Sequence, residues 1–247
     1  MFTPRSRSSG DGLRRSVALL RAFTVEQTQP EVFYGLLADD SARIVESFTP
    51  LRGRTVLDVG AGPEQFAAAF ARRGALYVAV DADPEALTTS DLPGTAALVA
   101  RGERLPVRTA SVDVAFSSNV FEHVQRPSML GDELVRVTRP GGVVVLAYTN
   151  WLSPWGGHET SPFHYLGGSR AVRRYERHYG RPPKNRVGEN LFKVSVAEGL
   201  RWARTRPDAD LVEARPRYYP RWARSLLRVP GVREVLTWNL LLVLRRR

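Results

Sequence analysis

A glycine turn that follows an apolar run constrains this chain more than any other feature of its sequence. Residues 55–66 are Thr-Val-Leu-Asp-Val-Gly-Ala-Gly-Pro-Glu-Gln-Phe, and residues 67–71 are alanines and a phenylalanine. The pattern predicts a buried strand, a turn and a helix, which together make one βα unit. Glycine permits a positive φ and has no Cβ, so a ligand can closely approach the backbone amides of such a turn. The turn favours a nucleotide-like cofactor, although glycine also occurs in such turns for steric reasons alone.

A second apolar run, Ala75–Asp81, ends in a carboxylate. Asp81 lies about twenty residues beyond the turn, which is where the acid that binds the ribose stands in dinucleotide folds. A carboxylate offers paired acceptor oxygens to the two ribose hydroxyls. The alternative is that Asp81 caps a helix that begins at Pro84.

Two more apolar runs, residues 112–118 and 142–148, predict further strands. The segments VLDVGAG, VAVDAD, GERLP, SVDVAFSSNVFEHV and VTRPGGVVVLA, in this order, resemble the class I S-adenosylmethionine-dependent methyltransferases. The resemblance covers about residues 50–150 and is greatest to the type 11 branch, which includes enzymes of quinone biosynthesis. It implies an α/β fold: a Rossmann-like, doubly wound, seven-stranded sheet, mostly parallel with an antiparallel last strand and with helices on both faces. The implied cofactor is S-adenosyl-L-methionine.

The resemblance also assigns roles to particular residues. Asp58 and the turn glycines would surround the methionine moiety, and Asp81 would accept hydrogen bonds from both ribose hydroxyls. Ser117 and Asn119 would lie under the sulfonium, at the carboxyl end of their strand. The cofactor-binding residues implied in this way are Asp58, Gly60, Ala61, Gly62, Asp81, Ala82, Gly102, Glu103, Ser117 and Asn119.

Two positions depart from the family pattern. Glu64 stands where relatives often have a further glycine, and Arg101 stands where many carry an aspartate for the adenine amino group. Backbone groups around Gly102, or the side chain of Glu103, would then contact the adenine. A degraded cofactor site in a non-catalytic relative is the alternative.

Length and composition bound the domain organisation. A chain of 247 residues with 43% apolar content suffices for one α/β domain with a small addition. The absence of cysteine excludes disulfides, thiolate metal sites and cysteine-dependent pyrimidine C5 methylation. The expected organisation is a disordered tail (1–12), an N-terminal helical cap (13–49), a cofactor-binding core (50–149), a substrate loop or lid (150–190) and a basic C-terminal part that completes the sheet (191–247).

The basic charge is confined to the C-terminal third. Residues 1–169 hold 16 Arg and 18 acids, whereas residues 170–247 hold 20 Lys and Arg and 7 acids. This asymmetry favours an anionic partner, such as an anionic membrane contacted through residues 170–247 or an anionic acceptor; a solvated basic face is the alternative. Nucleic acid is disfavoured, because residues 117–120 are Ser-Ser-Asn-Val in place of the Asn/Asp-Pro-Pro-aromatic tetrad of amino-methylating nucleic-acid enzymes.

No run of about eighteen apolar residues occurs, and residues 1–10 lack the apolar core of a signal peptide. We therefore expect a cytoplasmic protein, with a peripheral membrane contact as a second expectation. Helical spacing over 13–23 and 30–48 predicts two helices, which usually cover the cofactor site in this family.

The segment 149–168 is rich in aromatic residues, glycine and proline, and we predict that it is a substrate loop. Its proton acceptors, His158, Glu159 and His164, are the candidate catalytic residues, because methyl transfer to a hydroxyl benefits from a base. His123 is a rival, and each histidine has the alternative role of binding loop backbone. We predict no metal site, since His158, Glu159 and His164 on one loop lack a fourth ligand. The candidate substrate-binding residues are Tyr148, Trp151, Trp155 and His123.

The C-terminal part predicts a helix over 168–179 and a second helix that starts with the capping pattern Ser195–Glu198. Residues 210–214 and 238–244 predict an antiparallel pair of strands that flanks a helical excursion at 222–227. Trp202, Trp222 and Trp238 are expected to be packing residues.

The leading function is methyl transfer from S-adenosyl-L-methionine to a small-molecule or lipid-like acceptor, with oxygen favoured as the atom methylated. Two alternatives are a non-catalytic S-adenosylmethionine-binding module and an NAD-dependent oxidoreductase. The oxidoreductase is disfavoured because Gln65 stands where the third glycine of a dinucleotide turn would be.

Overall fold

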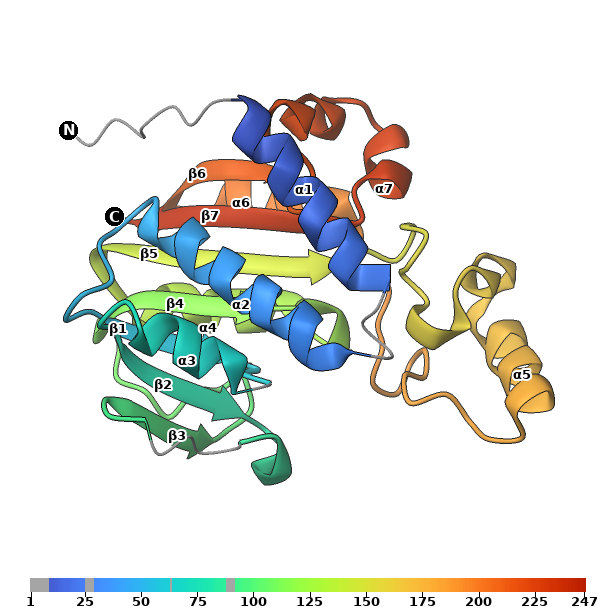
Figure 1. Cartoon of the computed structure of the whole chain (residues 1–247), viewed down its shortest axis with the longest axis horizontal. Coiled ribbons are helices and arrows are strands. Elements are labelled where there is room, and N and C mark those ends of the chain that lie inside the picture. Colours follow the sequence, from blue (N-terminus) through green and yellow to red (C-terminus); the bar gives the residue numbers. More distant parts are fainter. Residues whose placement is uncertain (1–8, 25–28, 63, 88–91) are drawn as a thin grey trace.

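The fold is built on one seven-stranded sheet (Figure 1). The computed structural model describes residues 9–24, 29–62, 64–87 and 92–247. The strands lie in the order β3-β2-β1-β4-β5-β7-β6, and β7 is antiparallel to both β5 and β6. This arrangement confirms the predicted fold class. The strands are β1 (Thr55–Val59), β2 (Leu76–Asp81), β3 (Thr95–Val99), β4 (Val112–Ser118), β5 (Thr138–Thr149), β6 (Ala209–Pro216) and β7 (Asn239–Arg246).

Helices cover both faces of the sheet, with α1, α2 and α3 on one face and α4 and α6 on the other (Figure 1). The helices are α1 (Ser9–Thr24), α2 (Pro30–Glu46), α3 (Gln65–Ala71), α4 (Pro127–Val137), α5 (Gly168–Tyr179), α6 (Val196–Thr205) and α7 (Val232–Leu236). Short 3-10 helices are η1 (Pro84–Ala86), η2 (Phe121–His123), η3 (His158–Thr160), η4 (Phe163–Leu166) and η5 (Arg221–Arg228).

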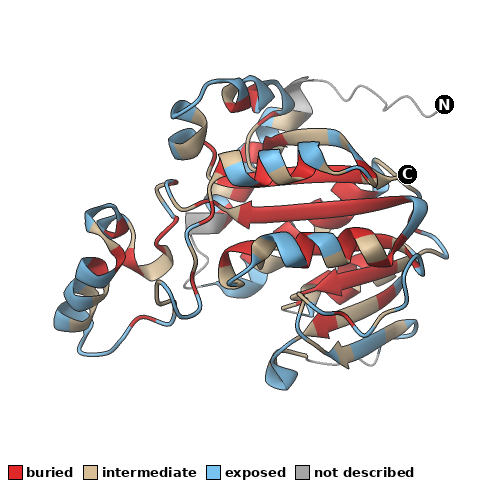
Figure 2. Cartoon of the chain, turned by 180° about the vertical axis from the view of Figure 1, so that it is seen from behind, coloured by how far each residue is buried: buried red, intermediate tan, exposed pale blue. Residues whose placement is uncertain are grey.

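The central strands are buried on both faces, which explains their continuous apolar runs (Figure 2). Successive side chains of a strand point to opposite faces, so Val143 and Val145 pack against α2 and α3, whereas Val144 and Leu146 pack against α4 and α6. Parallel pairing of β1 with β2 and with β4 places the carboxyl ends of these strands at one edge of the sheet. Ligands bind at this edge in open α/β folds.

Most predicted elements are confirmed within a few residues. The capping box at Ser195 and Glu198 is present at the start of α6. The excursion expected at 222–227 is the 3-10 helix η5. Helix α1 begins at Ser9, inside the segment expected to be a disordered tail, since polar residues are common in the unpaired first turn of a helix. Residues 1–8 of that expected tail lie outside the described residues.

A projecting part of the molecule, which we call the lobe (residues 151–194), lies beyond the carboxyl end of β5 and carries α5 (Figure 1). The lobe begins and ends at one point of the body, because the Trp151 N–H donates to the Val194 carbonyl at 2.9 Å. Most of α5 is exposed (Figure 2). Among the described residues, no helix combines the length and the apolar content that crossing a bilayer requires.

Candidate functional site

The glycine turn after β1 has the geometry that only glycine adopts easily. Gly60 has a φ of +75° and Gly62 has a φ of +56°. The amides of Gly60 and Ala61 both donate to the Val80 carbonyl, at 2.7 and 3.2 Å, so they join the turn to β2. A Cβ added at Gly60 would overlap the side chain of Val120, whereas Gly62 has open space around it. Gly60 therefore brings the turn close to the segment after β4, and Gly62 leaves room beside it.

Asp58 lies within β1 and is buried, with a 2.6 Å hydrogen bond from the Tyr77 hydroxyl to its Oδ2. Burial raises the pKa of Asp58 to about 7, although the Tyr77 hydrogen bond opposes this rise. Tyr77 lies on β2, beside β1 in the sheet. The side chain of Asp58 thus has a hydrogen-bond partner inside the protein, and this buried pair stabilises the strand end that leads into the turn.

Asp81 ends β2 at the same edge and is half-buried. Its Oδ1 accepts from the Asp83 N–H at 3.0 Å, and Ala82 lies exposed between the two. The cap of the short helix η1 is Asp83, whose Oδ1 accepts from the Glu85 N–H at 2.9 Å. Asp81 is therefore not the cap that the alternative interpretation required, and its second oxygen is compatible with a ligand.

The segment around Gly102 packs tightly below the edge. A Cβ at Gly102 would press on Leu130 and Val59, so glycine is required there for close packing. Arg101 is exposed and lies 3.7 Å from Glu103, whose side chain is 15% exposed. Glu64 is exposed at the start of α3 and makes no side-chain cap. The two departures from the family pattern thus lie at the surface.

Ser117 and Asn119 close the carboxyl end of β4. The buried Ser117 hydroxyl donates to the Val59 carbonyl at 2.8 Å and ties β4 to β1. Asn119 has a φ of +58°, an uncommon left-handed conformation outside glycine, and its Oδ1 accepts from Asn239 Nδ2 at 2.7 Å. Asn119 therefore turns the chain sharply at the sheet edge.

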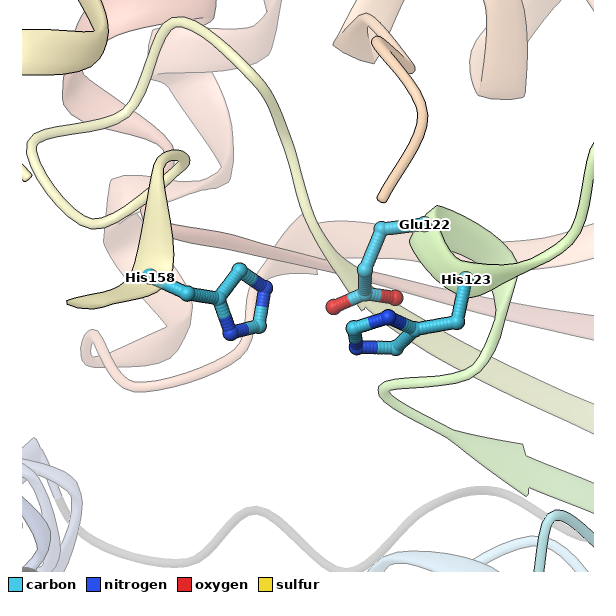
Figure 3. A group of neighbouring side chains, drawn as sticks. All are labelled: Glu122, His123 and His158. Atoms are coloured by element: carbon cyan, nitrogen blue, oxygen red, sulfur yellow. The ribbon is translucent and has the colours of Figure 1, made fainter. Parts of the chain in front are cut away.

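Three side chains from two segments meet directly beyond this turn: Glu122, His123 and His158 (Figure 3). One ligand atom from each lies within 4.8 Å of the other two. The rings of His123 and His158 are 5.1 Å apart between centroids. His158 has a φ of +49°, so its position in the lobe is held against a local conformational cost. Burial lowers the pKa of His158 to about 4 and raises the pKa of Glu122.

The structure does not bring Glu159 and His164 into this group. Glu159 accepts from Asn185 Nδ2 at 3.0 and 2.9 Å and so binds one part of the lobe to another. His164 is buried, with its ring centroid 5.0 Å from that of Trp151 and 4.1 Å from that of Tyr165. Burial lowers the pKa of His164. Both residues hold the lobe together.

The predicted substrate-binding aromatic residues lie in two different parts of the molecule: Tyr148 in the core, and Trp151 and Trp155 in the lobe. Tyr148 is fully buried and its hydroxyl donates to the Ser195 carbonyl at 2.7 Å, so it packs against α6. Trp151 is half-buried in the lobe, and Trp155 is 41% exposed beside Trp238, with 6.0 Å between ring centroids. Strand alternation could have placed Tyr148, because it shares the face of Val144 and Leu146.

Sequence reasoning missed two residues, Glu122 and Arg217. Arg217 is 1% exposed and follows β6 at this edge; its guanidinium donates to the hydroxyls of Ser118 and Ser41, at 2.6 Å each. Its Nε has no hydrogen-bond partner among the described residues, and Asp40, the nearby acid, is bound by Arg15. Burial lowers the pKa of Arg217. No local signal distinguishes Arg217 from the other arginines of the basic third, whereas Glu122 adjoins His123 in the quoted motif.

Comparisons with known proteins agree with this geometry. A family model described as a methyltransferase domain matches residues 57–146. The chain is 50% identical to an uncharacterized methyltransferase of Mycobacteroides abscessus, over 95% of each chain. It is 52% identical to another of Mycolicibacterium gilvum, over 94% of each chain. A crystal structure of an S-adenosylmethionine-dependent methyltransferase from Mesorhizobium loti shares the fold, with a TM-score of 0.57 and 16% identity over 85% of this chain and 100% of that chain.

Proposed function

Since the chain belongs to the class I S-adenosylmethionine-dependent methyltransferases, we propose that it methylates a hydroxyl oxygen of a small or lipid-like anionic acceptor. The methyl donor is S-adenosyl-L-methionine, which supplies an electrophilic methyl group on a sulfonium. The protein's part is to align the acceptor with this methyl group and to take up the acceptor's proton.

The residues at the sheet edge fit the cofactor. Gly60 leaves no Cβ between the turn and Val120, and Gly62 leaves space beside the turn. Asp81 keeps one carboxylate oxygen for the turn to Asp83 and can offer the other to a ribose hydroxyl. In the proposed site, these residues bind and orient the donor, and Asn119 fixes the chain beside it.

The main observation in favour of oxygen as the methylated atom concerns Nε2 of His158. This nitrogen is buried and has no hydrogen-bond partner within the described part of the chain; it lies beside Glu122 and His123, beyond the carboxyl ends of β4 and β5. With a pKa of about 4, His158 is neutral at physiological pH, so its Nε2 can accept a hydrogen bond from a hydroxyl, but on its own it is a weak base. The Glu122 carboxylate nearby would stabilise the imidazolium that forms. A neutral amine would attack the methyl group through its own lone pair and would not require this base for the transfer step.

Arg217 supports an anionic acceptor. In the part of the chain that the structure describes, the buried Arg217 guanidinium has no hydrogen bond to a carboxylate, and its Nε has no partner. Such burial is costly, and an anion at Nε would offset that cost. Arg217 binds Ser118, the residue before Asn119, so an anion there would lie at the same edge as the donor. Either the acceptor or the donor's own carboxylate has suitable chemistry.

The lobe supports an amphiphilic acceptor and contact with an anionic membrane. Helix α5 carries exposed arginines, and the preceding segment carries exposed apolar side chains. Arg174 lies 4.0 Å over the ring of Phe163 and so joins the two. Leu166 is 63% exposed and Tyr165 is 48% exposed. Such a surface suits an anionic head group with an apolar body. A ring hydroxyl, as in the quinone-biosynthesis branch, is one acceptor of this class, and that finer resemblance stays a prediction.

Calorimetric titration with S-adenosyl-L-methionine tests the donor site first. We expect micromolar binding to the wild-type protein and loss of binding by Asp81→Ala, because the mutant lacks the carboxylate for the ribose. The exposed neighbour Asp83→Ala is the matched control and should retain most of the affinity. Equal affinities of the two variants would contradict the assigned site.

Acceptor screening then tests whether the methyl group is transferred to oxygen. Anionic phenols and hydroxylated lipids are incubated with the donor, and products are identified by mass and by the position of the new methyl group. We expect O-methyl products and a fall in turnover for His158→Ala but not for His178→Ala, a histidine on the exposed helix α5. Products methylated only on nitrogen or carbon would contradict the proposal.

A further inference from the structure

Two buried polar atoms beyond the ends of β4 and β5 have no hydrogen-bond partner among the described residues: Oε2 of Glu122 and Nε2 of His158. Figure 3 shows the Glu122 carboxylate next to the His123 ring, with the His158 ring facing both. One ligand atom from each residue lies within 4.8 Å of the others. Buried polar atoms without partners are costly, so a group bound between these side chains would remove a real penalty.

Hydrogen bonds on the outer side fix the orientation of two of these side chains. The Thr149 N–H donates to Oε1 of Glu122 at 2.9 Å, which leaves Oε2 as the free oxygen. The His123 ring lies with Nδ1 2.7 Å from the Asn190 carbonyl oxygen. Because a carbonyl only accepts, Nδ1 carries the proton and Nε2 keeps its lone pair. A metal-binding histidine is held in this way in proteins, with its second nitrogen bound to a carbonyl or carboxylate.

The kind of donors determines the kind of ion. Two imidazole nitrogens and one carboxylate oxygen suit Zn²⁺ and other divalent first-row transition metals, whereas Mg²⁺ and Ca²⁺ prefer oxygen ligands alone. Three protein ligands leave a further coordination position open, which is typical of catalytic zinc sites. Three ligands from η2 and the lobe would also join the body of the protein to the lobe.

We infer that Glu122, His123 and His158 form a binding site for a divalent transition-metal ion, with Zn²⁺ as the preferred ion. On the loop itself, the neighbours of His158 are Glu159 and His164, from which no metal site is predicted. The fold instead joins His158 to the motif after β4. The inference concerns metal binding, and its consequence for the acceptor rests on the proposed function: an ion there would lower the pKa of a hydroxyl at its open position. This role would replace that of His158 as a base.

Metal binding is tested on the full chain after treatment with a chelator. Calorimetric titration with ZnCl₂ should give one ion per chain, and CoCl₂ should give the visible absorption of a low-coordinate Co²⁺ ion. MgCl₂ should bind far more weakly. Loss of an outer hydrogen-bond partner commonly weakens a metal site by about 10–100-fold, so loss of a ligand in Glu122→Gln or His158→Asn should exceed about 100-fold.

His178→Ala is the matched control, because His178 is exposed on α5 and lies outside the group. Circular dichroism and S-adenosyl-L-methionine binding verify that each variant is folded. The inference is overturned if the wild-type protein binds no Zn²⁺, or if His178→Ala weakens binding as much as His158→Asn. Metal binding with no O-methylated product would contradict the proposed function alone, and O-methylation by a wild-type protein that binds no Zn²⁺ would contradict the inference alone.

Discussion

The cofactor-binding core (residues 50–149) and the lobe are stabilised by different means. In the core, strand pairing and glycine geometry place the functional groups, and Gly60, Ser117 and Asn119 are all held by backbone or buried contacts. In the lobe, where residues 151–194 are all described and include no strand of the sheet, side-chain contacts such as Glu159 with Asn185 and His164 with Trp151 join the helices and loops. Under the proposed function, the core binds the methyl donor, and the acceptor is bound by the lobe, whose surface depends on individual side chains.

If burial determines the charge states of groups in the core, Asp58 should make the largest contribution to the pH dependence of the free energy of unfolding. Its pKa is about 7 in the folded chain against 3.8 ordinarily, so the folded state keeps a proton that the unfolded state releases. The free energy of unfolding should therefore fall as the pH rises from about 4 to about 7, by at most about 1.4 kcal/mol per unit for this group. Urea denaturation across this range measures it. Asp58→Asn should flatten the slope, and an unchanged slope would show that other groups dominate.

The backbone geometry of the glycine turn predicts the next largest change in the free energy of unfolding. Gly60→Ala combines a positive φ with overlap on Val120, and should lower the free energy of unfolding by about 2–4 kcal/mol. Gly141→Ala is the control, since Gly141 also has a φ of +75° but nothing within 4 Å of an added Cβ. This variant should lose only about 1 kcal/mol. Similar losses in urea denaturation would mean that contact with Val120 is unimportant.

The smallest change in the free energy of unfolding is expected from a substitution in the lobe. Glu159→Ala removes both hydrogen bonds to Asn185, at a cost of about 1 kcal/mol. We expect faster hydrogen exchange and proteolysis within residues 159–190, with unchanged S-adenosyl-L-methionine affinity. Glu176→Ala, on α5, is the control. A fall in cofactor affinity for Glu159→Ala would show that the lobe and the core are coupled more closely than their contacts indicate.

Local patterns predicted the core well, because hydrophobic periodicity and glycine spacing encode strands and turns directly. The strand, turn and helix around Gly60 and the capping box at Ser195 follow from patterns within a few residues of each other. The antiparallel β7 is instead implied by the resemblance to the family. The sequence placed Tyr148 at the substrate, whereas its side chain is buried against α6, since position on the strand face outweighs position at the strand end.

Contacts between distant segments could not be predicted in this way. His158 lies beside Glu122 and His123 only because the lobe folds back on the turn after β4, and no local pattern encodes that return. Arg217 is buried where Ser41 of α2 and Ser118 at the end of β4 meet its guanidinium, while most arginines of the same third remain exposed. Only the three-dimensional arrangement shows that these residues all lie near the carboxyl ends of the parallel strands.

The hydrogen bond between Trp151 and Val194 has a consequence for how such enzymes diversify. A segment whose two ends meet at one point of the body can be lengthened, shortened or exchanged while the sheet keeps its register, because loop closure depends only weakly on length. The lobe can therefore be regarded as a cassette. Under the proposed function, grafting a different cassette between residues 150 and 195 should change the acceptor while the sheet and its donor site are kept.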